Sequence, residues 1–517
     1  MSLPTGGPWP PKPYDQALAA MSTWDAWVVG DPAGLIAVYG GWQAQQQQAR
    51  PSQYSGGLLG LASRAFWGKP QAGLVDRRRH LPVAADLCRM SSQLLFAAPP
   101  MFTVPDRQGN DAAKTRLDRI VNTPGTHSAL LEGAFYAAGL GGVYLRLVWD
   151  TEVADHVMLD IVDADRAIPD FRWGHLVGVT FWDKLAVPEG TSEQAVWRHL
   201  ERHEPGRILH GLYKGTADKL GAPQPLEDHP DTKAYATLVD AEGAISTGVK
   251  GLTAAYVPNA RPMPAWRTNA KLCDLGKPDL AGGVEPLMQD IDEAWSSLMR
   301  DLRLGKGRLV VPEYMLTNLG AGMGAAFDAD QEIFTPLSMP PSDMNVKQIT
   351  PQQFDIRVEQ HLGVINAALR EVLRATGYSP LTFGMPDEVA ATATEIHSRE
   401  KDSLQTRGSK IRHWSAALGP LATTLLQLDA LVFHSGAVVS EDVDLSWPDG
   451  AREPLLVRSQ SVQAMALAQA ASTETRVRIM QPDLDALDVK KEADLIRAEQ
   501  GMAVPDPFAA ANSPSGA

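Results

Sequence analysis

The spacing of apolar residues changes twice along the chain, and this constrains the fold more than any other feature of the sequence. Up to Gly141-Gly142 the apolar side chains recur every three or four residues, which is typical of helices that bury one face. In 143–266 they alternate one by one, as in half-buried strands. At Gly282-Gly283 the helical spacing returns. The pattern therefore predicts an α+β protein, mainly helical, in which an antiparallel meander lies on helices.

Two local patterns support the strand region. One face of a first strand would carry alternate apolar residues, namely Val143, Leu145, Leu147 and Trp149. Residues 196–213 have the pattern of a hairpin that turns at Glu204-Pro205-Gly206-Arg207. Both patterns favour antiparallel pairing between neighbouring segments.

Long helices are expected after the strands. The first, 284–304, carries an apolar stripe and would be about 30 Å long at 1.5 Å per residue. Residues 305–349 are too many for a featureless loop, so we expect a small subdomain there. Another helix is expected at 392–433, with a kink at Gly419-Pro420 because proline removes a backbone hydrogen bond.

Between these two lies a helix that we expect at 350–377. Thr350 would be its N-cap, because a threonine hydroxyl accepts a hydrogen bond from a free backbone N–H. Pro351 would be its first helical residue, where the missing N–H costs nothing. Gly377 would end the helix, because glycine readily adopts the left-handed conformation.

Composition limits the kinds of protein to consider. The 517 residues allow about three domains. A net charge of −14 argues against a protein that coats nucleic acid with clustered cations. The two cysteines, Cys88 and Cys273, cannot form a disulfide framework, which favours a reducing compartment. We expect neither a signal peptide nor a membrane span, since the N-terminus lacks the signal pattern and no apolar run approaches ~18–20 residues.

Motifs of known catalytic chemistry do not stand out. The sequence contains no GxxxxGK[ST], HExxH or GxSxG pattern. His199 and His203 lie in a strand pattern, where half-buried strand histidines are favoured over zinc ligands. Cys88 lies on an apolar helix stripe, which favours a buried thiol over a nucleophile. We therefore expect no enzyme activity, no cofactor and no metal, with a hydrolase or nuclease as the weaker alternative.

Several strings, taken in order, resemble bacteriophage portal proteins, which form the head-to-tail connector of tailed double-stranded-DNA phages. The most similar is ATATEIHSREKDSLQTRGSKIRHWSAAL at 391–418. Three others precede it: RRRHLPVAADLCRMSSQLLFAAPPMFTV (77–104), EPLMQDIDEAWSSLMRDL (285–302) and LREVLRATGYSPLTFG (369–384). A weaker match covers 472–500. None of these strings is catalytic, and it is their order that makes the resemblance specific.

The resemblance implies a portal-protein fold with wing, stem, clip and crown, assembled as a ring of twelve subunits. The implied parts are the wing at 1–281, the stem helices at 284–304 and 350–377, the clip at 305–349, the tunnel loop at 378–391, the long wing helix with a strand at 392–450, and the crown with a disordered tail at 451–517. The ring would sit at one capsid vertex, with assembly in the host cytoplasm, and double-stranded DNA would be packaged and ejected through it.

The resemblance also implies candidate site residues and partners. The tunnel loop would present Thr382, Phe383, Gly384, Met385, Pro386, Asp387 and Glu388 to the channel, or would pack on the next subunit. Arg300, Arg303, Lys306 and Arg308 could form a sparse basic girdle, although solvated or inter-subunit ion pairs explain them equally well. Implied partners are the terminase large subunit, a head-tail adaptor, and the major capsid and scaffold proteins. Another structural virion protein, such as a minor capsid or adaptor protein, is the alternative.

Overall fold

The computed structural model describes most of the chain and divides it into two compact units, Met1–Pro448 and Asp449–Ala517. The described residues are 3–46, 79–105, 110–188, 194–304, 308–310, 317–318, 325–326, 350–352, 356–385, 400–437, 439, 442–448, 455–481 and 486–501. Among them, 50% are helical and 19% lie in strands. The expectation of a mainly helical chain is therefore corrected: the described part is a mixed α/β structure, because strands account for about a fifth of it.

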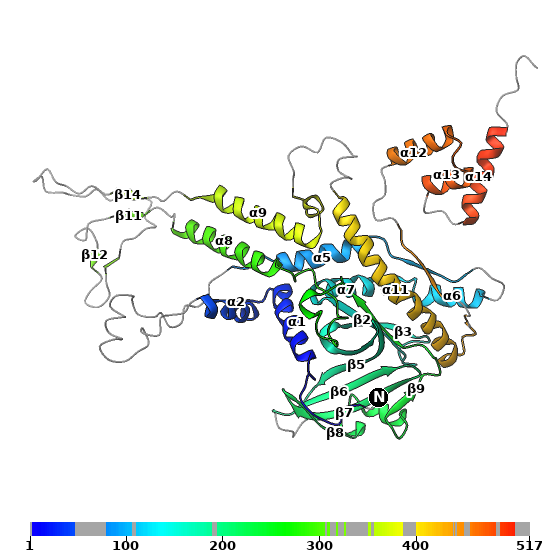
Figure 1. Ribbon diagram of the computed structural model, residues 1–517, viewed down its shortest axis with the longest axis horizontal. Helices are drawn as coiled ribbons and strands as arrows, with labels where there is room; N and C mark the ends of the chain where they lie inside the picture. Colours follow the sequence, from blue (N-terminus) through cyan, green and yellow to red (C-terminus); the bar gives the residue numbers. More distant parts are fainter. Residues whose placement is uncertain are drawn as a thin grey trace, which may run out of the picture. The chain divides into compact units, whose positions relative to one another are not determined.

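The first unit begins with a helical layer (Figure 1). Its elements are α1 (Tyr14–Val29), α2 (Pro32–Gln46), α5 (Val83–Leu95), β1 (Met101–Thr103), α6 (Asp111–Ile120) and α7 (Pro124–Leu140). At the start of α7 the Thr123 hydroxyl accepts a hydrogen bond from the Thr126 backbone N–H, and Pro124 is the first helical residue. The helix ends at Gly141, whose φ of 93° suits glycine alone.

A three-stranded antiparallel sheet follows directly. Its order is β10 (Ala254–Pro258), β2 (Gly142–Val148), β3 (Met158–Asp163). The predicted face of β2 is confirmed, since Val143, Leu145 and Leu147 are buried in one apolar core. Tyr144 points to the other side and joins a second core. The central strand of this sheet therefore separates two cores, with helices α7 and α11 contributing to the first.

The larger sheet is the predicted meander. Its strands run in the order β4 (Ala167–Arg172), β5 (His175–Leu185), β6 (Val196–Glu204), β7 (Arg207–Thr216), β8 (Lys219–Gln224), and β9 (Ala244–Ser246) pairs with β7. The predicted hairpin is confirmed, because Glu204 pairs with Arg207 and Gly206 has a φ of 85°. Short 3₁₀ turns connect these parts: η1 (Ala164–Arg166), η2 (Leu226–Asp228), η3 (Lys233–Thr237) and η4 (Pro264–Trp266).

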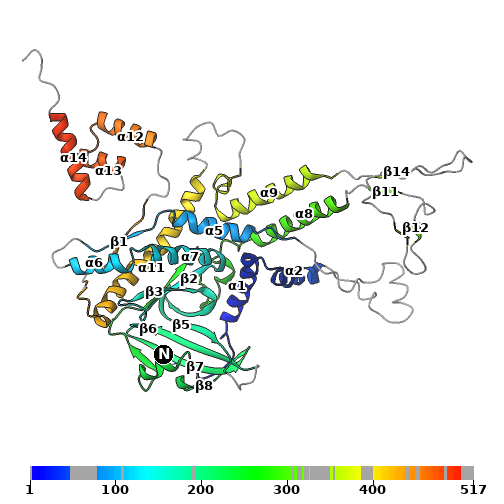
Figure 2. The same cartoon turned by 180° about the vertical axis from the view of Figure 1, so that it is seen from behind.

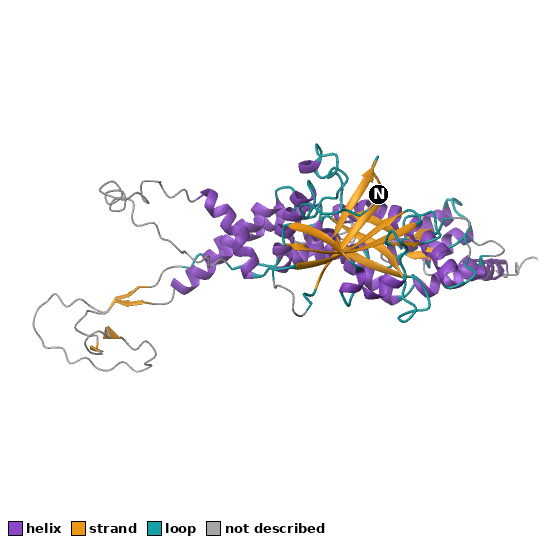
Figure 3. Ribbon diagram, turned by 90° about the horizontal axis from the view of Figure 1, so that it is seen from below, coloured by secondary structure: helices purple, strands orange, loops and turns teal. Residues whose placement is uncertain are grey.

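Two long helices then leave the body side by side. They are α8 (Val284–Leu304) and α9 (Val358–Thr376), which contact each other and extend away from the sheets (Figures 1 and 3). The expected bounds of the first helix are confirmed. Gly377 ends α9 with a φ of 78°, as expected.

The expected start of the second helix is wrong. Thr350–Gln352 forms strand β14, which pairs antiparallel with β11 (Arg308–Val310), and α9 begins at Val358. Thr350 is thus not an N-cap, nor Pro351 a first helical residue. A proline is tolerated in this two-stranded ladder because each strand is an edge. The short strands β12 (Thr317–Asn318) and β13 (Ala325–Ala326) form another pair in the same stretch.

Helix α11 (Lys401–Val432) crosses the body (Figure 2). Fourteen of its residues are buried, from Ser403 to Asp429. Pro420 lies inside it, and the predicted kink stays a prediction. By length and composition α11 is long and apolar enough to cross a membrane, and 56% of its apolar window is buried inside the protein. After α11, β15 (Asp444–Ser446) pairs with β1.

In the second unit the described residues form three short helices. They are α12 (Leu455–Leu467), α13 (Thr473–Met480) and α14 (Ala486–Gly501). The Ser472 hydroxyl caps α13 by accepting a hydrogen bond from the Thr475 backbone N–H. Val477, Val489 and Ala493 form its small core.

Candidate functional site

The segment that follows α9 is the described part of the predicted tunnel loop. Thr382 and Phe383 lie in the 3₁₀ turn η6 (Pro380–Phe383), and Gly384 ends this turn with a φ of 67°. Phe383 and Met385 are half-buried and pack against the larger apolar core of the same chain. Pro386, Asp387 and Glu388 lie outside the described residues.

This segment is tied to the first turns of α11 by hydroxyl groups. The Ser379 backbone N–H donates to Ser403 Oγ at 2.8 Å, and Thr382 Oγ1 lies 2.8 Å from the same oxygen. One turn later, the Thr406 hydroxyl donates to the Gly377 carbonyl at 2.7 Å. Because Ser403 is buried, these contacts are shielded from water and place residues 377–382 firmly on α11.

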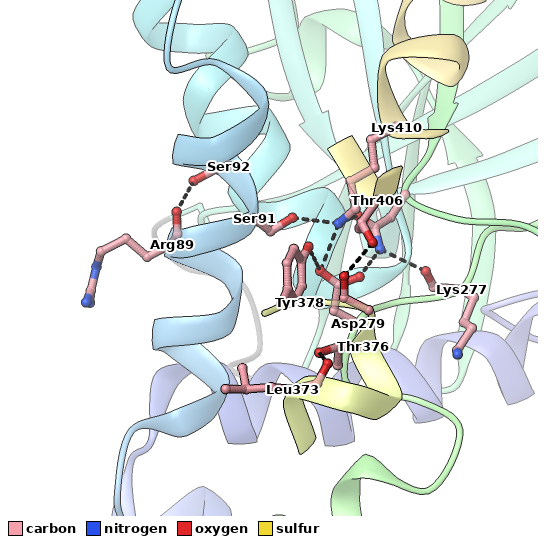
Figure 4. A network of polar contacts seen from close by, with 12 residues as sticks. Arg89, Ser91, Ser92, Lys277, Asp279, Leu373, Thr376, Tyr378, Thr406 and Lys410 are labelled. Atoms are coloured by element: carbon pink, nitrogen blue, oxygen red, sulfur yellow. Dashed lines mark hydrogen bonds and ion pairs between the residues drawn. The ribbon is translucent and has the colours of Figure 1, made fainter. Parts of the chain in front are cut away.

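Behind the segment lies a buried polar cluster centred on Lys410 of α11 (Figure 4). The Lys410 ammonium donates to Ser91 Oγ at 2.6 Å, Asn259 Oδ1 at 2.7 Å and Asp279 Oδ2 at 2.8 Å. The Tyr378 hydroxyl donates to the same Asp279 oxygen at 2.9 Å, and Asn259 Nδ2 donates to Asp279 Oδ1 at 2.8 Å. All three ammonium protons and both carboxylate oxygens therefore have partners.

The charged groups of this cluster are shielded from water. Only 5% of the Lys410 side chain and 7% of the Asp279 side chain are exposed. Burial, followed by the charge of Asp279, raises the pKa of the Tyr378 hydroxyl well above its usual value, so the phenol stays a donor. An ion pair at this depth is tolerated because its hydrogen bonds replace the lost water. The cluster therefore joins α5, the 259–279 segment, the end of α9 and α11 at one point.

A second set of polar contacts holds the base of α8. Asp292 of α8 is 1% exposed. It accepts hydrogen bonds from the Tyr39 hydroxyl and, at 2.8 Å, from the Leu81 backbone N–H, and it lies 2.9 Å from His80 Nδ1. Glu285, in the first turn of α8, accepts a hydrogen bond from Trp24 Nε1 at 2.9 Å. The base of α8 is thus bonded to α1, to α2 and to the segment before α5.

The predicted girdle residues are only partly described. Arg300 is exposed on α8. Arg303 lies in the last turn of α8 and Arg308 in β11, but their side chains are outside the described part, as is all of Lys306. Between the two helices, His361 Nε2 of α9 lies 3.0 Å from Asp301 Oδ2 of α8. Among the described side chains, Arg300 forms no hydrogen bond or ion pair with the segment at 382–385.

The strand histidines form a buried group in the large sheet. His203 Nε2 lies 2.6 Å from Glu201 Oε1, and His199 Nε2 lies 3.2 Å from His210 Nδ1. Burial lowers the pKa of His210 to about 4, so this imidazole is neutral near pH 7. In the part of the chain that the structure describes, no three His, Cys, Asp or Glu side chains are placed to hold a metal ion.

Sequence reasoning missed the Lys410 cluster entirely. A signal was present, because Lys410 lies four residues before Trp414 and eight before Leu418, on the same buried stripe of α11. A charged residue at such a position needs a buried partner. The sequence does not say that the partner is Asp279, which lies far away along the chain.

Comparisons with known proteins give structural neighbours only. No family model matches the chain, and no curated protein matches it. A chain from the neck of an empty gene transfer agent (GTA) particle is 14% identical, with a TM-score of 0.36, and the match covers 84% of this chain and 96% of that one. A chain from the neck of a native particle is 13% identical, with a TM-score of 0.37 and coverage of 81% and 92%.

A chain from the virion of a native gene transfer agent particle is similar to the same degree. It is 14% identical, with a TM-score of 0.36, and the match covers 84% of this chain and 96% of that one. The chain is therefore similar, over most of its length, to components of the neck and virion of gene transfer agent particles.

Proposed function

We propose that this chain is a portal protein, a subunit of the ring at one capsid vertex through which double-stranded DNA is packaged and ejected. The observation that carries the proposal is the helix pair α8–α9, which leaves an α/β body with an inserted segment between the two helices (Figure 1). In a ring, such pairs would stand side by side as the stem around a central channel.

The surface of the pair supports assembly. Large apolar side chains remain uncovered in the single chain: Leu302 is 41% exposed, Val358 38%, Leu362 40% and Val364 56%. Val358 and Leu362 lie four residues apart on one face of α9, and exposed apolar patches of this kind mark contact sites in soluble proteins. Neighbouring copies around a cyclic axis would cover these side chains.

The charge of the chain suits a channel through which DNA slides better than a protein that binds DNA tightly. Proteins that bind DNA tightly neutralise its phosphates with clustered cations, and a chain with a net charge of −14 is unlike such proteins.

The segment at 378–391 would be the tunnel loop, held from behind by Ser403, Thr406 and the Lys410 cluster. Residues 305–349 would be the clip that docks terminase and adaptor, and 451–517 the crown. Packaging would then draw its energy from a separate motor, the chain itself having no catalytic role.

The direct test is particle mass and shape. The purified chain, examined by mass photometry and negative-stain electron microscopy, should give rings with a central hole. A monomer at every salt concentration and at high protein concentration would contradict the proposal. ATPase and nuclease assays with Mg²⁺ test the non-enzymatic part, and turnover that co-purifies with the rings would overturn it.

A further inference from the structure

A groove runs beside α11 on the side of the small sheet. It consists of two adjoining cavities of about 450 and 420 Å³, which share Arg261 and His413 in their walls. On α11 the lining residues recur every three or four positions, so they occupy one helix face; they include Asp402, Ser409, His413, Ala417, Pro420 and Thr424. At 1.5 Å per residue, the stretch from Asp402 to Thr424 is about 33 Å long.

Cations dominate one half of this groove. The larger cavity is lined by Arg261, Lys277, Arg374 and Lys410, against the acids Asp279 and Asp402. Lys410 is neutralised by Asp279, and Arg374 pairs with Glu371. Arg261 and Lys277 have no carboxylate partner among the described residues. This is a positive surface on a chain whose net charge is −14.

Two further observations locate the positive charge. The Arg261 guanidinium lies over the rings of Phe171 and Tyr256, at 6.0 and 5.9 Å, which holds it at the groove wall. Burial lowers the pKa of His413, and the charges of Arg261, Arg412 and Lys410 lower it further. The cations therefore converge on the junction of the two cavities.

An acidic face lies around β3, at the other edge of the same sheet. It consists of Asp25 of α1, Glu132 of α7, Asp163 of β3 and Asp165 of η1. Burial, and then the charge of Asp165, raises the pKa of Asp163 to about 6. In the described part of the chain none of the four carboxylates forms an ion pair, and the nearby Arg166 pairs with Asp183. The four carboxylates therefore repel one another, and the charge of Arg166 offsets this repulsion only in part at Asp163.

The sheet register places the groove and the acidic face at the same level along the strands. Strand β2 lies between β10 and β3, and Val257, Val143 and Asp163 form one row across the three strands. The groove borders the β10 end of this row, because Tyr256 and Pro258 line it. At roughly 4.8 Å per strand, the row from Val257 to Asp163 spans about 10 Å. Helices α1 and α11 are drawn to either side of this sheet (Figures 1 and 2).

We propose that the groove beside α11 receives the acidic face of a second copy of this chain, giving a head-to-tail contact that repeats from subunit to subunit. The inference rests on the proposed ring, and it names the surfaces that close it. A contact between two different surfaces closes into a ring when the rotation permits. The unpaired cations and unpaired carboxylates complement each other and set the register. The apolar half of the groove adds burial around them.

Charge reversal tests this contact. A groove variant, Arg261→Glu with Lys277→Glu, and an acidic-face variant, Asp25→Lys with Glu132→Lys, are each examined by mass photometry. We expect each variant alone to need at least a tenfold higher concentration than the natural chain to form rings. Combining all four substitutions in one chain should restore rings. Mixing the two variants in equal amounts should also restore rings. The groove variant then has two acidic surfaces and the acidic-face variant two basic ones, so alternating copies present opposite charges at every contact.

The controls separate this contact from general effects of charge and folding. Lys233→Glu and Glu227→Lys change exposed residues on the large-sheet side and should leave ring formation unchanged. Circular dichroism and thermal unfolding check that each variant folds, and Arg261→Gln with Lys277→Gln should weaken assembly less than the reversal.

Each outcome has a defined meaning. Rings from both reversed variants at the natural concentration would overturn the inference and leave the portal proposal standing. Loss of rings without rescue, either in the combined chain or in the mixture, would also overturn the inference. A natural chain that never forms rings would overturn the portal proposal itself.

Discussion

At the scale of single residues, two buried or half-buried charges show how much their surroundings matter. Lys410 uses every ammonium proton inside the protein, so its charge is compensated. Asp163 has no ion-pair partner among the described residues, and its carboxyl group is held near other acids. The Lys410 charge therefore stabilises the fold only as part of the complete cluster. The Asp163 charge destabilises the folded state.

Replacing Lys410 should be costly. Lys410→Met would leave Asp279 buried without its cation, and breaking a buried pair in this way costs about 3–5 kcal/mol. Urea unfolding of the natural chain and the variant measures the difference. Arg412→Met, at an exposed position two residues further along α11, is the matched control and should change the free energy of unfolding by less than about 0.5 kcal/mol. Equal effects of the two substitutions would contradict the role given to the cluster.

The effect of Asp163 should depend on pH. Its pKa in the folded protein is about 6, above the ordinary value of 3.8, because of burial and then the charges of Asp165, Glu132 and Asp25, with Arg166 opposing. The folded state therefore binds this proton more tightly than the unfolded state, and stability falls as pH rises from about 4 to 6. Asp163→Asn should raise Tm at pH 8 and leave it nearly unchanged at pH 4. A gain of the same size at both pH values would refute this assignment.

At the scale of elements, the end of α9 and the start of α11 act as one support. Gly377 ends α9, and hydroxyl groups of Ser403 and Thr406 hold the residues that follow. The predicted tunnel loop is therefore carried by a stiff base, and half-buried Phe383 lies between the base and the residues beyond it.

Removing the two hydroxyl groups should loosen this base. Ser403→Ala with Thr406→Val deletes the groups that bond to residues 377–382 and should cost about 1–3 kcal/mol, because buried backbone groups lose their partners. Hydrogen exchange at 378–385 should become faster than in the natural chain, while the large sheet keeps its protection. Ser409→Ala, at an exposed position of α11, is the control. Unchanged exchange at 378–385 would show that these hydroxyl groups do not position the segment.

At the scale of the whole molecule, the surfaces proposed for assembly and the proposed channel segment lie on different elements. The exposed apolar residues of α8 and α9 and the groove beside α11 lie on elements other than the segment at 382–388. Damage to that segment should therefore affect passage of DNA and not the formation of the ring.

Deletion of 382–388 tests this separation. Rings should form at the same concentration as for the natural chain, because the proposed contact surfaces remain. DNA packaging or retention, measured as nuclease-protected DNA per particle, should fall strongly. Normal packaging by this variant would exclude the tunnel-loop role, and loss of rings would mean that the segment belongs to the contact between subunits.

The sequence by itself determined the elements that depend on near neighbours along the chain. The 204–207 hairpin, the buried face of β2, the bounds of α8 and the end of α9 at Gly377 all follow from apolar spacing and from glycine conformation. These features are local, since steric preference and side-chain period act over only a few residues.

Only the tertiary structure decided where distant segments meet. Thr350–Gln352 became a strand because Arg308–Val310 pairs with it, against its helix-start pattern. Lys410 found Asp279 across 131 positions, and the acidic and basic surfaces came to opposite edges of one sheet through strand order. Such contacts depend on chain topology and on the burial of charge, which the one-dimensional pattern of apolar residues does not encode.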